Sequence, residues 1–464
     1  MTILASFAVP HPPIILPEVG QGEEEKIRKT IAAYDTVMEK AAGLQPDTLI
    51  ITSPHGEMYI DYFHIAPGPT ARGDFAQFRA PQVELSVRYD RDLASLITEE
   101  AREAGIPAGF EGERDPALDH GTMIPLYFYR KYDSLDKVKV VRIGLSGLGP
   151  DVHYLFGRCI REAVEKLGRR AVFIASGDLS HKLKEDGPYG YVPEGPVFDR
   201  QCTEALGQGD FFRLLTLDHS LCTRAAECGL RSFWIMAGAW DGMDVKARLL
   251  SYEGPFGVGY GVAAFLPGAP DPGRKFLSPL LAAEKKQREE RVAREDPYVK
   301  LARLAVETYV KDREIPSLPE GLPPEMLSAR QGPLCPSISG TSSGAVSAPS
   351  CHPEQPGGRN PPERDLRRHP GSPFPPVRPE ELPYLEYNVD VLTTPEPVSG
   401  PEQLDPRKYG VIVKSAQDER RGLLLPDLDG VDTVGDQIAI ARQKGNIAVT
   451  EPVQLFRFQV VRHR

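Results

Sequence analysis

Four polar side chains follow apolar stretches of the chain in the way that site residues follow buried strands. Each of these residues comes directly or shortly after its apolar run: His11 after 2–9, His55 after 49–53, His181 after 171–175 and Glu253 after 246–252. Runs of this length and composition are typical of strands covered on both faces. Neutral imidazole and carboxylate are good ligands for iron(II), and two histidines with one carboxylate leave three metal positions open for substrate and oxygen. The pattern predicts one metal site assembled from distant parts of the chain.

The individual residues suit different roles in such a site. His11, His55 and Glu253 fit the ligand role, whereas His181 fits either a third ligand or a base that works near neutral pH. Asp178 precedes His181 by three residues in S-G-D-L-S-H and could orient its ring.

His120 stands in L-D-H-G-T-M-I-P-L, immediately before a predicted helix. A helix N-terminus together with an imidazole makes a reasonable site for an anion or for oxygen. A histidine beside a strand is more often a hydrogen-bonded packing residue, and we assign His64, His153 and His219 to that class. Glu253 has a simple alternative as well, a solvated carboxylate before a turn.

The elements that must position these side chains alternate along the first 268 residues. The expected strands are 2–9, 47–53, 60–65, 82–88, 138–144, 170–175, 246–252 and 259–265. The expected helices are 23–42, 91–104, 151–167, 197–207 and 220–240. This alternation predicts an α/β domain with a mixed, mostly parallel sheet and helices on both faces. Open sheets of this class bind ligands at the carboxyl ends of their strands, where the polar residues above fall.

Glycine and cysteine give weaker signals. The clusters at 144–149 and 254–261 do not fit G-x-G-x-x-G at a strand-to-helix turn, so we expect tight turns and close backbone approach there and no nucleotide cofactor. The six cysteines include no C-x-x-C pair, which disfavours a zinc ribbon, and we expect buried free thiols.

Composition limits the partners. The formal net charge is −10, which argues against nucleic acid or an anionic membrane as the main partner. The chain has no signal-like opening and no apolar run near the roughly 20 residues of a membrane helix. We therefore expect a soluble cytoplasmic protein.

The chain changes character after residue 268. We expect a charged helical linker over 269–294 and a small α+β domain over 295–464, with a helix that begins at Asp296-Pro297. Residues 332–373 form the disrupted middle of this domain, rich in proline, glycine and serine and without Phe, Tyr or Trp. Such a segment buries too little apolar surface to offset the entropy of ordering, so disorder is expected.

The motifs of the first domain resemble those of the catalytic subunit-B (LigB) family of class III extradiol ring-cleavage dioxygenases, a fold group that also includes the metal-binding Memo proteins. The matching stretches are V-P-H-P-P-I-I, S-P-H-G, L-D-H-G-T-M-I-P-L, S-G-D-L-S-H and Y-E-G. The resemblance implies that His11, His55 and Glu253 bind non-haem iron(II), with zinc or copper as alternatives. It also implies that His181 takes the proton of a catecholic hydroxyl, and that His120 lies near oxygen and substrate. The implied reaction opens a catechol-type ring with O2.

Residues 295–464, apart from their middle, resemble the AMMECR family, through stretches such as K-Y-G-V-I-V and R-R-G-L-L-L-P-D-L-D-G-V-D-T-V. The fusion points to the AmmeMemoRadiSam group and so to a radical-SAM protein as a partner. The family's R-G-C-I-G-T motif is absent, yet codons for 343–350 can spell it in a shifted reading frame. We therefore predict a frame error within 332–373, with a real disordered insertion as the alternative; resequencing the gene decides between them.

Three functions follow from these observations. The first is an iron(II) dioxygenase that acts on a small catechol-like substrate with O2. The second is a Memo-like metal-binding or interaction protein without ring cleavage, and the third is a metal-dependent hydrolase that uses the histidines with zinc. A set of two histidines and one carboxylate favours oxygen chemistry, while an all-histidine set favours zinc. A homo-oligomer is compatible with each.

Overall fold

The computed structural model describes residues 3–327, 334–339, 346–347, 377, 379, 382, 385–428 and 430–463. The chain divides into two compact units, Met1–Lys286 and Gln287–Arg464. Each unit is described by itself below.

An eight-stranded mixed sheet forms the centre of the first unit, with the order β4-β5-β7-β2-β8-β1-β10-β9. Its strands are β1 (Ile3–Val9), β2 (Thr48–Ser53), β4 (Thr70–Phe75), β5 (Ala80–Tyr89), β7 (Lys139–Gly144), β8 (Ala171–Ser176), β9 (Met243–Glu253) and β10 (Tyr260–Pro270). The five strands from β5 to β1 are parallel, and β4, β10 and β9 are joined to the sheet by antiparallel pairing. A separate short pair consists of β3 (Phe63–His64) and β6 (Ala108–Gly109). The predicted mixed, mostly parallel sheet is confirmed.

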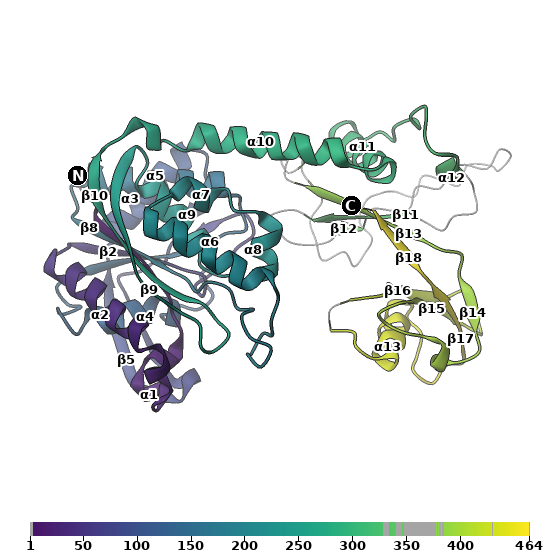
Figure 1. Cartoon of the computed structure of the whole chain (residues 1–464), viewed down its shortest axis with the longest axis horizontal. Coiled ribbons are helices and arrows are strands. Elements are labelled where there is room, and N and C mark those ends of the chain that lie inside the picture. The colour runs from purple at the N-terminus through teal and green to yellow at the C-terminus, as the bar shows by residue number, and fades with distance from the viewer. Residues whose placement is uncertain are drawn as a thin grey trace. The chain divides into compact units, whose positions relative to one another are not determined.

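Helices cover both faces of this sheet (Figure 1). The helices of this unit up to residue 239 are α1 (Pro17–Gly20), α2 (Arg28–Gly43), α3 (Arg91–Glu103), α4 (His120–Tyr129), α5 (Pro150–Lys166), α6 (Glu194–Gln208), α7 (Phe211–Leu215), α8 (His219–Ala225) and α9 (Leu230–Ala239). Helix α10 (Leu277–Arg294) comes later and continues past Lys286, where the first unit ends. Strand β2 shows why two layers are needed: Leu49 and Ile51 pack with α2 and α4, while Ile50 packs with α3, α5 and α9. All three side chains are fully buried. Because side chains alternate along a strand, a uniformly apolar run requires cover on both faces.

The register brings the carboxyl ends of the central strands to one level. Val9 at the end of β1 pairs with Ser176 at the end of β8, and Ser53 at the end of β2 pairs with Gly144 at the end of β7. Residues that follow these strands therefore emerge side by side at one edge of the sheet, the edge where open α/β sheets bind their ligands.

The elements of this unit differ from expectation at three places. The expected strand 60–65 is only the two-residue β3, which pairs with β6 outside the large sheet. The predicted helix 220–240 is two helices, α8 and α9, because Ala226 adopts a left-handed conformation (φ 52°) and interrupts the helical hydrogen bonds before Gly229 caps α9. Strand β4 was not predicted; it carries the charged residues Arg72 and Asp74 around Gly73 and pairs only with β5. An edge strand has one unpaired side and tolerates such a polar pattern.

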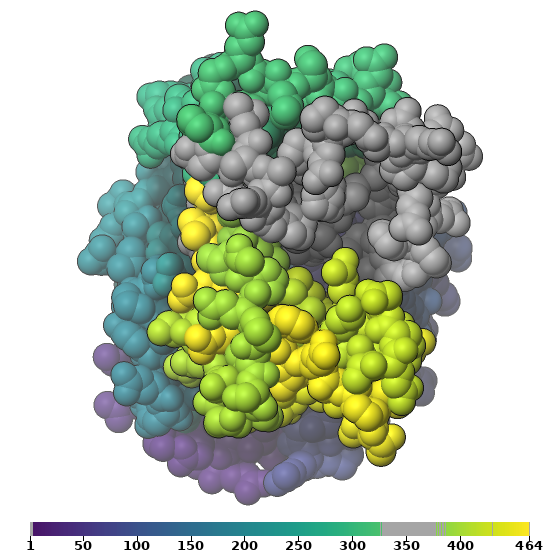
Figure 2. Space-filling view, turned by 90° about the vertical axis from the view of Figure 1, so that its right-hand side faces the viewer, coloured from purple at the N-terminus to yellow at the C-terminus, as the bar shows by residue number. Residues whose placement is uncertain are grey.

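The second unit has two four-stranded sheets, ordered β12-β11-β13-β18 and β14-β17-β15-β16 (Figure 1). Figure 2 shows the surface of the C-terminal part of this unit in yellow-green and yellow. Its described elements are α11 (Pro297–Asp312), α12 (Pro324–Leu327), β11 (Leu334–Ser339), β12 (Val346–Ser347), β13 (Glu386–Leu392), β14 (Glu396–Val398), β15 (Gly410–Ser415), β16 (Arg421–Leu424), α13 (Val434–Lys444), β17 (Val453–Phe458) and β18 (Val460–His463). The predicted helix start is present, because the Asp296 carboxylate accepts hydrogen bonds from the backbone N–H groups of Tyr298 and Val299. Helix α11 packs Val299 against Val389 and Val391 of β13.

The predicted disruption at 332–373 falls mostly outside the described residues; within it the structure describes only β11 and β12. Over the part of the chain that the structure describes, no helix is both long enough and apolar enough to cross a membrane.

Candidate metal centre

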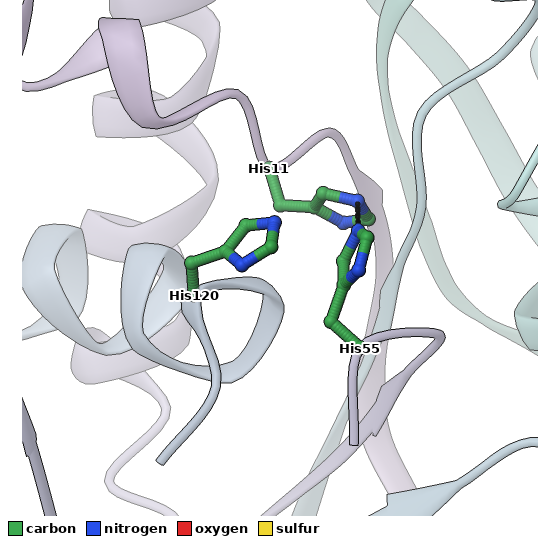
Figure 3. A group of neighbouring side chains, drawn as sticks. All are labelled: His11, His55 and His120. Atoms are coloured by element: carbon green, nitrogen blue, oxygen red, sulfur yellow. Dashed lines mark hydrogen bonds between the residues drawn. The ribbon is translucent and has the colours of Figure 1, made fainter. Parts of the chain in front are cut away.

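Three histidines meet at the carboxyl edge of the large sheet (Figure 3). His11 follows β1, His55 follows β2 and His120 is the first residue of α4. One ring nitrogen of each lies within 4.8 Å of the others, the one such group of three or more histidine, cysteine or acidic side chains in the described chain. Imidazoles that converge in this way are typical of a transition-metal site.

The fully buried His11 is held at both its backbone and its ring. Its backbone N–H donates to Asp178 Oδ1 over 2.7 Å, and its ring Nδ1 lies 3.0 Å from Ser176 Oγ. The Ser176 hydroxyl donates its own proton to the carbonyl of Gly121 over 2.7 Å, so it can only accept from His11. Nδ1 therefore carries the hydrogen, and Nε2 keeps a free lone pair that faces the other histidines.

His55 is positioned through Ser53, the last residue of β2. The backbone N–H of His55 donates to Ser53 Oγ over 3.2 Å, and this hydroxyl donates to Asp119 Oδ1 over 2.5 Å. Asp119 is also the N-cap of α4, where its carboxylate accepts from the backbone N–H and the hydroxyl of Thr122. The same carboxylate thus fixes both the loop of His55 and the helix that begins with His120.

The electrostatics of the group favour neutral imidazoles. Burial lowers the pKa of His11 well below its ordinary value, and the neighbouring His55 lowers it further. Burial also lowers the pKa of His55, and burial together with the nearby His55 and His11 lowers the pKa of His120 to about 3. Neutral imidazole is the metal-binding form, so the site is prepared for a cation without losing protons first.

The spacing of the donor atoms fits a single ion. His11 Nε2 and His55 Nε2 are 2.9 Å apart. Two nitrogens bound to one metal at about 2.1 Å lie about 3.0 Å apart at a right angle and about 3.4 Å apart in a tetrahedron. The ring planes of His55 and His120 are tilted by 34° with centroids 4.0 Å apart, so His120 approaches the same point from the α4 side.

Cys228 is a site residue that the sequence did not reveal. Its Sγ lies 3.5 Å from His11 Nε2 and accepts a hydrogen bond from the backbone N–H of Asp178 over 3.3 Å. In a tetrahedral site with metal–sulfur and metal–nitrogen bonds of about 2.3 and 2.1 Å, sulfur and nitrogen are about 3.6 Å apart. The other free cysteines described, Cys159, Cys202 and Cys222, are buried as expected. Cys228 reaches the site because the break between α8 and α9 turns it inward.

Two glycines allow that approach. A Cβ on Gly177 would lie 2.0 Å from the Cα of Gly229, closer than any real contact. Gly177 joins Ser176 to Asp178, and Gly229 follows Cys228, so their contact sets the distance between Cys228 and His11.

Glu253 requires a correction, because the structure does not bring it into the group. It ends β9, and its Oε2 accepts from the backbone N–H and the hydroxyl of Thr30 near the start of α2, both over 2.8 Å. Strand β9 is separated from β1 by β10, which places Glu253 roughly 10 Å to the side of the strand that leads to His11. Its carboxylate stabilises the N-terminus of α2, as acidic groups do at helix starts.

The structure does not show the expected contact between the Asp178 carboxylate and the His181 ring. Asp178 orients the backbone of His11, and no hydrogen bond joins it to the His181 ring. Burial raises the pKa of Asp178 to about 6. Within the described structure His181 Nδ1 has no hydrogen-bond partner, its ring meets Tyr189 edge to face at 5.2 Å, and its charge contributes to the lowered pKa of His11. His181 therefore acts on His11 electrostatically but is not a member of the group of three, and its Nδ1 is unused among the described residues.

The histidines assigned to packing behave differently from these. His64 and His153 are buried, and His153 packs edge-on against Phe63 and Trp234. His219 begins α8. None of them belongs to the group of three among the described residues.

Comparison with known proteins assigns the class. Residues 5–263 match the family model described as the catalytic LigB subunit of aromatic ring-opening dioxygenase, and residues 371–463 match AMMECR1. The chain belongs to the LigB family, with an AMMECR1 domain after the LigB domain. LigB proteins are generally metal-dependent, which agrees with the histidine group.

Individual relatives extend this assignment. Protein CA_C1420 of Clostridium acetobutylicum is 37% identical over the full length of both chains. The 2-aminophenol 1,6-dioxygenase beta subunit of Pseudomonas is 27% identical over 56% of this chain and 92% of its own. A MEMO1 family protein of Pyrococcus furiosus is 27% identical over 37% of this chain and 60% of its own. The similarities thus include both ring-opening dioxygenase subunits and MEMO1 proteins.

Proposed function

We propose that the LigB domain is a non-haem iron(II) dioxygenase that opens a catechol-type ring with O2. Two observations carry the proposal: His11, His55 and His120 converge with ring nitrogens within 4.8 Å, and they lie in a domain that matches the LigB model. An all-histidine set by itself favours zinc, so the choice of iron(II) rests on the match to the ring-opening dioxygenase model. Three protein ligands on one side of an iron ion leave positions for two substrate hydroxyls and for oxygen. The bound metal would supply Lewis acidity and a meeting point for substrate and O2.

The chain's own residues would divide the remaining work. His181 would accept the proton of a substrate hydroxyl, because its Nδ1 has no partner among the described residues and its ring is near enough to His11 to lower the pKa of that residue. Asp119 and Ser176 would keep the ligand rings in place through the hydrogen bonds described above.

Anaerobic loading with iron(II), followed by oxygen uptake with a panel of catechols and aminophenols, tests this function. We expect uptake and a ring-opened product from the iron-replete wild type, and none from His11→Ala or His55→Ala, which should also fail to retain metal. Iron-replete protein that consumes no oxygen with any member of the panel would refute ring cleavage.

A second function is a Memo-like metal-binding role without ring cleavage. Two observations favour it: Glu253 does not join the histidines, and Cys228 stands 3.5 Å from His11. A thiolate with two imidazoles suits copper(I) or zinc better than iron(II). Competition among iron(II), zinc and copper(I) for the site separates the two functions. A preference for zinc or copper that is lost without Cys228 supports the metal-binding role. A preference for iron(II) that is lost without His120 supports the dioxygenase.

The fusion to an AMMECR1 domain leads us to propose a radical-SAM protein as a partner. Co-purification with the full chain from the native host, with and without the AMMECR1 domain, tests this proposal. A partner that binds equally well without that domain would contradict it.

A further inference from the structure

The buried carboxylate of Asp199 has no role in the metal centre described above. Asp199 lies in α6 with only 1% of its surface exposed. In the described structure it has no cationic partner; Oδ1 accepts from the backbone N–H of Ser180 over 2.8 Å, and Oδ2 accepts from the hydroxyl of Tyr252 over 2.6 Å. A buried carboxylate without a counter-charge is costly, and proteins tolerate that cost mainly where the group has a function.

One of these hydrogen bonds leads to the segment that carries His181, and the other leads to β9. Ser180 directly precedes His181, and Tyr252 lies near the end of β9. The Ser180 hydroxyl and the His181 backbone N–H both donate to the carbonyl of Ala225. The Ser180 carbonyl accepts from Gly259 N–H over 2.8 Å. Asp199 thus completes a set of contacts that ties this segment to α8 and to the turn between β9 and β10.

The neighbouring backbone at Gly259 lies so close to the Asp199 carboxylate that it leaves no room for a side chain. A Cβ on Gly259 would lie 2.1 Å from Asp199 Oδ2, so only glycine fits beside the carboxylate. Burial also raises the pKa of Asp199 to about 7, which agrees with a desolvated position. The His181 ring itself makes no hydrogen bond through Nδ1 among the described residues, so its place depends on its backbone.

We propose that Asp199 and Tyr252 form a positioning pair for His181, which hold its backbone so that its free ring nitrogen faces the metal centre. This inference rests on the proposed function for the role of His181 as a base. The geometric part, that Asp199 fixes the 178–181 segment, can be measured without any turnover.

Hydrogen exchange measured by mass spectrometry on the zinc-loaded full chain tests the proposal. Two readouts are needed: exchange of the backbone amides in peptides that span 177–182, and exchange at the ring carbon between the nitrogens of His181, whose pH dependence gives the ring pKa. In Asp199→Ala we expect amide exchange in this segment to rise about tenfold, the effect of one lost hydrogen bond. We also expect a changed ring pKa of His181, which a merely structural carboxylate would not produce.

Two further variants keep the test decisive if Asp199→Ala folds poorly. Asp199→Asn keeps an acceptor for Ser180 N–H and should restore wild-type exchange. Tyr252→Phe removes one donor only and should give an intermediate increase. Asp210→Ala is the matched control, because the Asp210 carboxylate also accepts from a backbone amide, that of Arg213 at the start of α7. Wild-type exchange and an unchanged His181 pKa in both Asp199→Ala and Tyr252→Phe would overturn the proposal.

Activity provides a separate arm. If the wild type opens catechols, Asp199→Ala should lower kcat by about 10- to 100-fold, as loss of supporting residues commonly does, with little change in KM. An inactive wild type would refute the proposed function and leave the exchange result to decide on Asp199.

Discussion

Gly177→Ala should damage the metal centre through the backbone, without changing any ligand. The new Cβ would stand 2.0 Å from the Cα of Gly229 and 3.0 Å from its nitrogen. Carbon atoms in contact prefer about 3.5–4.0 Å, so the two segments must separate by roughly 1.5 Å. Metal sites tolerate deviations of only about 0.2 Å in their bonds. The separation would move either Cys228 away from His11 or Asp178 away from the His11 backbone.

Two quantities should change in Gly177→Ala. The free energy of unfolding of the metal-free protein should fall by about 1–3 kcal/mol, the usual cost of overpacking. The affinity for zinc, measured by competition with a chromogenic chelator, should fall by about 10- to 100-fold.

Gly43→Ala is the matched control, because Gly43 ends α2 and a Cβ there meets nothing within 4 Å. It should leave zinc affinity unchanged and alter stability by no more than about 1 kcal/mol. Wild-type zinc affinity in a destabilised Gly177→Ala would show that the contact between the glycines does not support the site, and the reasoning above would be refuted.

The other predictions concern the ligands and the carboxylates. Cys228→Ser should weaken the binding of copper(I) or zinc at least tenfold, and His120→Ala should weaken the binding of iron(II), both measured by metal titration. A variant that binds the metal as tightly as the wild type would exclude the substituted residue as a ligand. Glu253→Gln should keep one metal per chain by elemental analysis and lower stability by about 1 kcal/mol, since it weakens the hydrogen bonds to Thr30; loss of the metal would reinstate Glu253 as a ligand. Burial raises the pKa of Asp199 from 3.8 to about 7, so the folded state binds the proton more tightly and stability from this group falls as pH rises from about 4 to 7. Asp199→Asn should remove that fall, on the order of a few kcal/mol, in urea titrations at pH 5 and pH 8; an unchanged pH dependence would contradict the raised pKa.

The sequence determined most of the sheet and named all three histidines of the group, although it placed His120 beside oxygen and substrate and not among the ligands. The apolar runs before His11 and His55 gave the strands β1 and β2, because only strands covered on both faces are apolar at every position. Parallel strands end at one edge, so residues that follow such strands meet there whatever lies between them in sequence. In the second unit the N-cap at Asp296 was equally readable, since a capping carboxylate and a proline act locally.

Tertiary structure alone decided the rest of the site. Glu253 ends an apolar run just as His11 and His55 follow theirs, yet β9 lies two strands from β1, and no local signal encodes the order of strands in a sheet. Cys228 lies in a stretch that reads as one helix, and the break at Ala226 that turns it toward His11 depends on packing between α8, α9 and the loop at Gly177. Local propensity specifies elements, but the meeting of donor atoms depends on long-range packing, which only the folded chain fixes.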